Sequence, residues 1–280
     1  MSNYKIVVDS CCEIPEEINK DLFIERVPLT LEVGDATIID DETFDQAKFL
    51  KMVDECPTCP KSACPSPERY MEAYDADVER VYVVTLTSKL SGSYNSAVLG
   101  KHLLEEGGKK VPTIHVFDSL SASAGETQLV MKIKELEEQG RTFEEVVENV
   151  ELFKNEMKTY FVLDNLDTLR KNGRLTGLKA VVVSTMNIKP IMYALDGTIA
   201  QKSQAIGTKK ALRKMADILI EEGKALHEKV LIISHCNCLE RAQLMKERLL
   251  EKIQFKAVYI LNMMGVSSMY ANDGGIIVTV

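Results

Sequence analysis

The sequence predicts an α/β protein of two domains. Over roughly the first half, short apolar runs rich in β-branched residues alternate with helical patterns, which is typical of a parallel sheet covered by helices. Beyond residue 142 this rhythm changes, and the Asp196-Gly197 pair between two apolar runs indicates a β-hairpin. We therefore expect a mainly parallel, doubly wound sheet in residues 1–158 and a mixed or antiparallel sheet in residues 159–280.

The first half contains four predicted strands, each followed by a predicted helix. Pro15 suits the start of a helix, because its fixed φ and missing N–H cost nothing there, and Gly140 is a usual helix terminator. The expected strands are 4–9, 26–33, 81–86 and 113–117, and the expected helices are 15–23, 43–56, 91–105 and 121–140.

The second half begins with a bridging helix and contains the hairpin. Periodicity distinguishes its helices from its strands, as in the first half. The expected helices are 143–157, one ending near 172–173, 208–222 and 239–252, and the expected strands are 159–163, 188–194, 198–201, 230–235, 256–261 and 275–280.

Composition excludes several classes of function. A formal net charge of −8 disfavours generic nucleic-acid binding through a broad basic face. No apolar run approaches the ~18 residues that a membrane span requires. The first residues lack a basic region followed by a small-residue cleavage site, so we expect a cytoplasmic protein that makes at most transient membrane contact.

Seven cysteines raise the question of a metal site. Cys56 and Cys59 have zinc-ligand spacing, and His235 and Cys236 offer two further ligands. Cys236 and Cys238 follow an apolar run at a spacing of two, so in a strand they would share a face as small buried hydrophobes. We favour this second interpretation and expect no metal, and an odd cysteine count without a secretion signal argues against a disulfide framework.

Three predicted strand-to-helix junctions are rich in hydroxyl groups. They are Asp9-Ser10, residues 85–94 and residues 118–123. Each alone is explained by helix capping, but the three together favour an anion site near Ser91, where Gly92 lets a ligand approach the backbone. An alternative is a serine hydrolase or transferase that uses Ser91 on an acyl substrate, although the Gly-x-Ser-x-Gly elbow is absent.

In combination, several segments of the chain resemble the DegV family of bacterial fatty-acid-binding proteins, and the resemblance covers essentially the whole chain. The residues that carry it are Val8-Asp9-Ser10, Glu13-Ile14-Pro15, Ser62-Ala63-Cys64-Pro65-Ser66-Pro67, residues 85–97 with Leu90-Ser91-Gly92-Ser93-Tyr94, Asp118-Ser119, Ser121 to Ser123, Asn172-Gly173-Arg174-Leu175, Ile188 to Ile191 and Asp196-Gly197.

The resemblance implies that one long-chain fatty acid lies in a tunnel between the two domains, with no cofactor. It further implies that a separate FakA-like fatty acid kinase phosphorylates the bound carboxylate, so that this chain, like the FakB proteins, is not the catalyst. The ligand-binding residues it implies are Ser62, Ser91, Gly92, Ser93, Ser119 and Tyr270, and the supporting or partner-contacting residues are Asp9, Ser10 and Arg174.

Several positions depart from the family pattern. Tyr270 stands where the family has a histidine, and Gly207 stands where it has an arginine before Thr-Lys-Lys. Cys64 also replaces a glutamine. A carboxylate only accepts hydrogen bonds, so hydroxyl and amide donors suffice to hold it, and we expect fatty-acid binding to be retained despite these departures.

Overall fold

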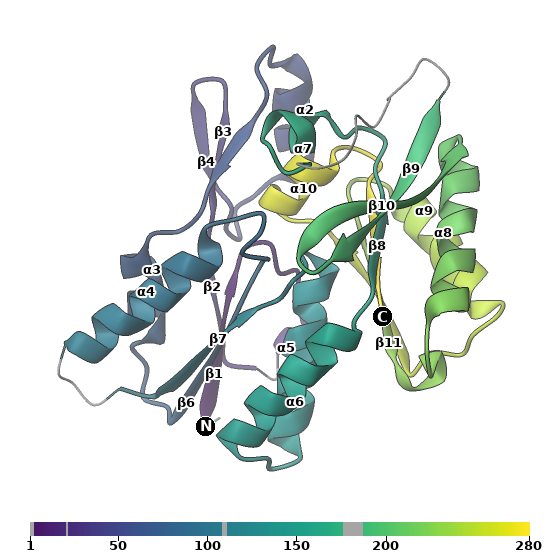
Figure 1. The fold of residues 1–280 in the computed structure, drawn as a ribbon. Helices are drawn as coiled ribbons and strands as arrows, with labels where there is room; N and C mark the ends of the chain where they lie inside the picture. Colours follow the sequence, from purple (N-terminus) through teal and green to yellow (C-terminus); the bar gives the residue numbers. More distant parts are fainter. Residues whose placement is uncertain (1–2, 21, 108–110, 176–186) are drawn as a thin grey trace.

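The N-terminal part of the chain is built around a four-stranded parallel sheet. The computed structural model describes residues 3–20, 22–107, 111–175 and 187–280. The strand order is β2-β1-β6-β7, with all three pairings parallel, which confirms the predicted sheet (Figure 1). The strands are β1 (Tyr4–Asp9), β2 (Ile24–Val27), β6 (Arg80–Thr85) and β7 (Thr113–Asp118).

Helices cover both faces of this sheet, as a parallel sheet requires. In Figure 1, α3 (Pro67–Tyr74) and α4 (Ser93–Glu106) lie to its left, and α5 (Ala124–Glu138) and α6 (Phe143–Glu156) lie to its right. Because each face has its own helices, the central strands are buried on both sides, and β1 and β6 have five consecutive buried residues each.

The C-terminal part contains a mixed six-stranded sheet in the order β10-β9-β8-β13-β11-β12. Only β11 and β12 pair in parallel, and the other pairs are antiparallel, as the sequence predicts. The strands are β8 (Thr159–Val162), β9 (Ile188–Leu195), β10 (Thr198–Ile206), β11 (Val230–His235), β12 (Ala257–Asn262) and β13 (Ile276–Thr279).

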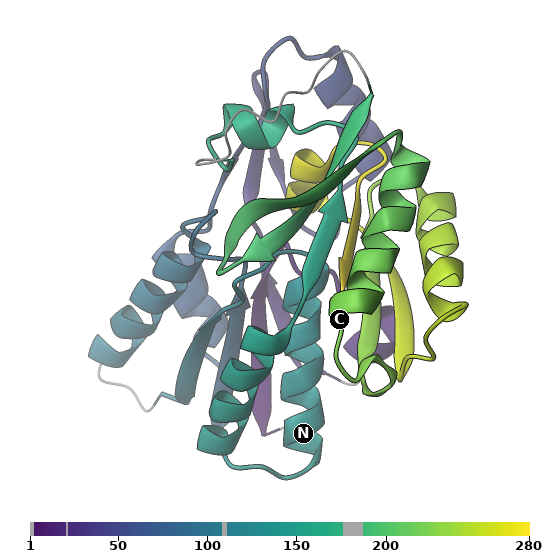
Figure 2. The same cartoon turned by 45° about the vertical axis from the view of Figure 1, so that its right-hand side comes forward.

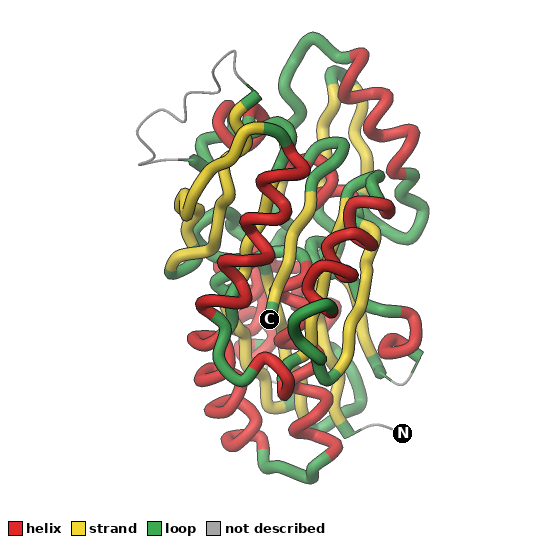
Figure 3. The backbone as a smooth tube through the Cα atoms, turned by 90° about the vertical axis from the view of Figure 1, so that its right-hand side faces the viewer, coloured by secondary structure: helices red, strands yellow, loops and turns green. Residues whose placement is uncertain are grey.

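Two long helices cover the outer face of this second sheet. They are α8 (Thr208–Glu222) and α9 (Leu239–Leu250), and Figures 2 and 3 show them packed side by side in front of the strands. The short 3₁₀ helix η1 (Leu226–Glu228) leads into β11. On the inner face α5 contacts β11 and β13, and Gln128 of α5 donates a hydrogen bond of 2.8 Å to the Val230 carbonyl. The helix α5 therefore contacts both sheets.

The structure corrects the predicted strand at 26–33. The predicted strand is interrupted at Pro28-Leu29. The part before the interruption, β2, joins the parallel sheet, and the part after it, β3 (Thr30–Val33), joins a separate antiparallel sheet with β4 (Ala36–Ile39) and β5 (Lys61–Ala63). The proline has no N–H to donate, and the strands on its two sides pair with different partners. The helix α2 (Gln46–Glu55), capped by Asp45, packs beside this small sheet.

The predicted helix 15–23 is shorter in the structure, where α1 spans Glu16–Asn19 and residue 21 lies outside the described part. The hairpin at Asp196-Gly197 is confirmed, and both residues have positive φ. Two short helices, α7 (Asp167–Lys171) and α10 (Gly265–Ala271), lie at the upper junction of the sheets in Figure 1. In the described part of the chain, no helix is long and apolar enough to cross a membrane.

Candidate functional site

A mainly apolar cavity of about 340 Å³ lies between the parallel sheet, the small antiparallel sheet and the C-terminal sheet. Its size falls in the range of small-molecule sites, roughly 300–1,000 Å³. Residues from several segments of the chain meet around it. The larger purely apolar lining residues are Leu29, Leu86, Leu90, Leu120, Phe161, Leu163, Leu169, Ile199, Val266 and Ile277.

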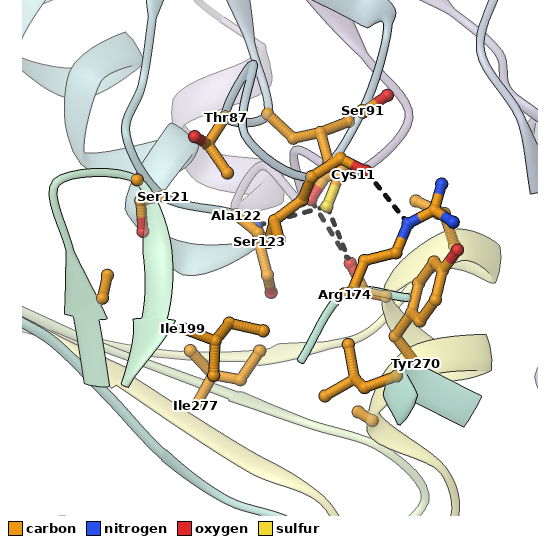
Figure 4. Close-up of a pocket in the computed structure, with 18 of the residues that line it drawn as sticks. Cys11, Thr87, Ser91, Ser121, Ala122, Ser123, Arg174, Ile199, Tyr270 and Ile277 are labelled. Carbon is orange, nitrogen blue, oxygen red and sulfur yellow. Dashed lines mark hydrogen bonds between the residues drawn. The ribbon is translucent and has the colours of Figure 1, made fainter. Parts of the chain in front are cut away.

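A cluster of three polar residues lies on one side of the cavity. Ser62 Oγ and the Tyr270 hydroxyl lie 3.0 Å apart, and the Arg174 guanidinium lies 5.8 Å from the centre of the Tyr270 ring. Arg174 Nε also donates to the Leu90 carbonyl at 3.1 Å. Figure 4 shows Arg174 and Tyr270 side by side, with Ile199 and Ile277 at a distance from them. Among the described lining residues Arg174 is the only charged one, so this side of the cavity favours an anion.

Local structure explains the position of Ser91. The amides of Leu90 and Ser91 both donate to the Thr87 carbonyl, which turns the chain just before α4. Ser91 Oγ accepts a hydrogen bond of 3.1 Å from the Ser93 amide at the first turn of that helix. At Gly92, which precedes α4, a Cβ atom would come within 2.9 Å of Cys64 Sγ, so a side chain there would narrow the cavity.

Not every predicted ligand-binding residue reaches the cavity. Ser62, Ser91, Gly92, Tyr270 and Arg174 line it. The other predicted site residues are fully buried beneath the lining. They are Asp9, Ser10, Ser93 and Ser119.

The buried residues hold the junction loops in place. Asp9 accepts hydrogen bonds from the Cys11 amide at 3.0 Å and from the Leu86 amide at 2.9 Å, which ties the loop after β1 to the loop after β6. Ser10 Oγ accepts from the Leu29 amide at 3.0 Å, and Ser119 Oγ donates to the Ser121 carbonyl at 3.0 Å. These side chains therefore shape the cavity without lining it.

Four carboxyl groups lie buried behind the same wall. Burial raises the pKa of Glu126 and of Asp9, and in Glu126 the charge of Asp9 raises it further. Burial also raises the pKa of Glu13 to about 7 and that of Asp40 to about 6. Glu13 accepts from the Met264 amide at 3.1 Å and Asp40 from the Gly265 and Val266 amides, so both hold the start of α10.

Further hydroxyl groups on the lining were not among the predicted site residues. They are Thr87, Ser121, Ser123, Thr159, Thr198 and Ser267. Thr87, Ser121 and Ser123 lie in two of the hydroxyl-rich junctions, so their sequence position already pointed to the site. Thr159 and Ser267 carry no such signal, because only packing brings their elements to the cavity. Ser121 Oγ and Thr159 Oγ1 lie 2.8 Å apart, which makes a polar contact between the two parts of the chain.

The structure gives no support to the alternative chemistries. In the described part of the chain, no three His, Cys, Asp or Glu residues form a group that could hold a metal ion. Cys236 is buried as predicted, but β11 ends at His235 and Cys238 caps α9, so the two cysteines do not share a strand face. No described lining residue is a histidine or a carboxylate, so Ser91 has no such base within the cavity.

The fold and the cavity define a class of protein: an α/β protein with a mainly apolar cavity between its sheets and one charged side chain among the described lining residues. The family comparison is more specific. A family model described as "Uncharacterised protein, DegV family" matches residues 3–279. A DegV domain-containing protein of Streptococcus pneumoniae is 35% identical over 278 residues, covering 98% of this chain and 97% of that protein. The chain belongs to the DegV family.

Solved structures agree in fold across the whole chain. A DegV family protein of Ruminococcus gnavus, refined with vaccenic acid, has a TM-score of 0.96 and 51% identity, with 100% of both chains covered. The Fatty Acid Kinase B3 protein of Streptococcus pneumoniae, loaded with linoleic acid, has a TM-score of 0.89 and 35% identity, covering 99% of this chain and 98% of that chain. A Eubacterium eligens DegV protein loaded with heptadecanoic acid has a TM-score of 0.90 at 26% identity, with 99% and 98% covered.

Proposed function

We propose that this protein binds one long-chain fatty acid in the cavity, with the carboxylate at the polar side and the acyl chain against the aliphatic lining. The observation that carries the proposal is that Arg174, the only charged residue among the described lining residues, lies on one side of a mainly apolar cavity. Ser62, Tyr270 and Arg174 gather in one place, while aliphatic residues form most of the remaining wall. The fatty acids in the related structures support the same choice of ligand.

The two ends of the ligand contribute differently to binding. Transfer of about fourteen methylenes at ~0.8 kcal/mol each gives roughly 11 kcal/mol before the costs of association. The carboxylate gains less, because it exchanges water for protein hydrogen bonds, but those bonds determine which end of the acid lies at Arg174. The acyl chain therefore supplies most of the affinity, and the polar side sets the orientation.

We further propose that the protein is a carrier in the cytoplasm and not the catalyst, and that it presents the carboxylate to a separate fatty acid kinase. The related Fatty Acid Kinase B3 protein supports this role. The Tyr270 hydroxyl is neutral, so a hydrogen bond from it would leave the carboxylate charged and nucleophilic for phosphoryl transfer by a partner. As part of the same proposal, residues 1–158 and residues 159–280 form two domains, and the fatty acid lies between these domains.

Native mass spectrometry of protein purified from a bacterial host tests the proposal. We expect a mass increase equal to one fatty acid, which organic extraction removes and oleic acid restores. Ser62→Val should weaken binding because it removes the hydroxyl that contacts Tyr270. Ser66→Ala, at the residue directly before α3 and outside the lining, is the control and should bind normally. Protein that carries no acid and takes up none in titration would refute the proposal.

Hydrolysis provides the test of the serine alternative. The purified protein is incubated with a long-chain acyl ester, and Ser91→Ala is compared with the unchanged chain. Turnover that disappears in Ser91→Ala would establish the enzyme and refute the carrier role. We expect no turnover in either protein, together with weaker binding of the acid by the variant.

A further inference from the structure

The Cys56-Pro57-Thr58-Cys59 segment lies outside the proposed binding function but next to its polar side. It follows α2 directly, and its two thiols are free and partly exposed. Pro60 comes next and leads into β5, which carries Ser62 of the cavity. The segment is therefore accessible from solvent and connected to a lining residue three positions beyond Cys59.

The two thiols have different surroundings. Cys56 Sγ lies 3.2 Å from Thr58 Oγ1, and hydrogen bonds from the Thr58 hydroxyl and amide lower the pKa of the Cys56 thiol. The thiolate is the reactive form of cysteine, so this environment favours Cys56 as the attacking sulfur. Cys59 Sγ instead lies 3.5 Å from Asn172 Nδ2 and 3.6 Å from the Pro60 carbonyl oxygen.

Asn172 connects Cys59 to the cavity. Its Nδ2 also donates to the Pro60 carbonyl at 3.0 Å, and its own carbonyl accepts a hydrogen bond from Arg174 Nη1. Asn172 follows the last residue of α7, so these bonds join the segment after α2 to the C-terminal part of the chain. A change at Cys59 therefore acts on the Asn172 side chain, whose amide also donates to the Thr168 carbonyl at 3.0 Å, and reaches Arg174 through the backbone of Asn172.

We propose that Cys56 and Cys59 form a reversible thiol–disulfide pair whose oxidation loosens Asn172 and, through it, Arg174 at the polar side of the cavity. The sulfur atoms of a disulfide lie about 2.0 Å apart. Both thiols are free in the structure, so at least one sulfur must move when the bond forms, and the contacts affected are those of Cys56 with Thr58 and of Cys59 with Asn172. The effect on ligand release rests on the proposed function, whereas the disulfide itself does not.

The oxidant is a low-molecular-weight disulfide. The Cys56 thiolate attacks one sulfur of that disulfide, forms a mixed disulfide and releases one thiolate, which takes up a proton. Cys59 then gives up its proton, attacks the Cys56 sulfur and releases the second thiol. In sum, two protein thiols and one small disulfide become one protein disulfide and two small thiols. An excess of small thiol reverses both steps.

The first experiment equilibrates the full chain with mixtures of oxidised and reduced glutathione, blocks free thiols and maps disulfides by peptide mass spectrometry. We expect a Cys56–Cys59 disulfide, lighter than the dithiol by two hydrogens. Cys59→Ser should retain glutathione on Cys56. Cys64→Ser, which alters one of the two cysteines among the described lining residues, should still form the disulfide. Thr58→Val should slow the first step. Free thiols at both positions throughout the titration would overturn the proposal.

The second experiment tests the connection to Asn172 by hydrogen exchange of the peptide covering residues 166–175. Oxidation should raise the exchange rate of this peptide in the unchanged protein and leave the rate in Cys59→Ser unaffected. Equal exchange in both redox states of the unchanged protein would overturn the proposed effect of the disulfide on Asn172. With a fluorescent fatty acid bound, oxidation should increase the release rate two- to tenfold, the loss expected for one hydrogen bond. Failure to bind any fatty acid would refute the proposed function, while the other two measurements would still decide the redox proposal.

Discussion

Replacing Glu13 by glutamine should stabilise the protein above neutral pH. Glu13 is 4% exposed, and its carboxyl group accepts from Ser123 Oγ at 2.6 Å and from the Met264 amide at 3.1 Å. Glutamine keeps one acceptor oxygen for the Met264 amide, and its NH₂ group donates to the Ser123 hydroxyl, which can turn to accept. The variant therefore retains both contacts without placing a charge in the interior.

The size of the effect follows from the pKa of Glu13. Burial raises it from 4.5 to about 7, and at ~1.4 kcal/mol per pKa unit this corresponds to about 3 kcal/mol. Because the folded state binds the proton more tightly than the unfolded state, this group's contribution to stability is complete below pH 4.5. It is lost as the pH rises through about 7. At pH 8 Glu13→Gln should thus be more stable by up to about 3 kcal/mol, and at pH 4.5 the two proteins should be nearly equal.

Urea unfolding at a series of pH values measures this difference. Other buried carboxyl groups titrate in both proteins, so the difference between the two stability curves isolates Glu13. The exposed Glu16→Gln is the control and should change stability by less than about 0.5 kcal/mol throughout. If the gain in unfolding free energy of Glu13→Gln over the unchanged chain were smaller at pH 8 than at pH 5, the reasoning would be refuted.

Three further predictions concern binding and packing. Tyr270→Phe removes the hydroxyl that contacts Ser62 and should raise the fatty-acid Kd about two- to tenfold in fluorescence displacement; an unchanged Kd would show that the hydroxyl does not contact the ligand. Gly100→Ala places a Cβ 2.6 Å from a backbone oxygen of α3 and should cost about 1–3 kcal/mol of unfolding free energy without changing that Kd. Thr142→Ala breaks the capping box that Thr142 forms with Glu145 at the start of α6 and should lower the free energy of unfolding by about 1 kcal/mol in the same urea assay. We expect this loss to be smaller than that of Gly100→Ala.

The local signals in the sequence were sufficient for the two large sheets. Alternating strands and helices predicted the parallel sheet, and Asp196-Gly197 predicted the hairpin, because both depend on periodicity and turn chemistry within short stretches. The small sheet was missed. Its strands β3, β4 and β5 are three or four residues long, too short for a period to be visible. Pro28-Leu29, between β2 and β3, lies inside the stretch 26–33 that was predicted as one strand.

For the site, the sequence by itself determined the family and the hydroxyl-rich loops, since these are properties of residue order. Only the tertiary structure decided which hydroxyl groups face the cavity. Ser91 lines it while Ser93, two residues later, is buried beneath it, because the turn before α4 directs the two side chains differently. It also decided that Asn172 lies against Cys59, a contact across 113 positions of the chain. Such contacts depend on how distant elements pack together, and no local spacing rule contains that information.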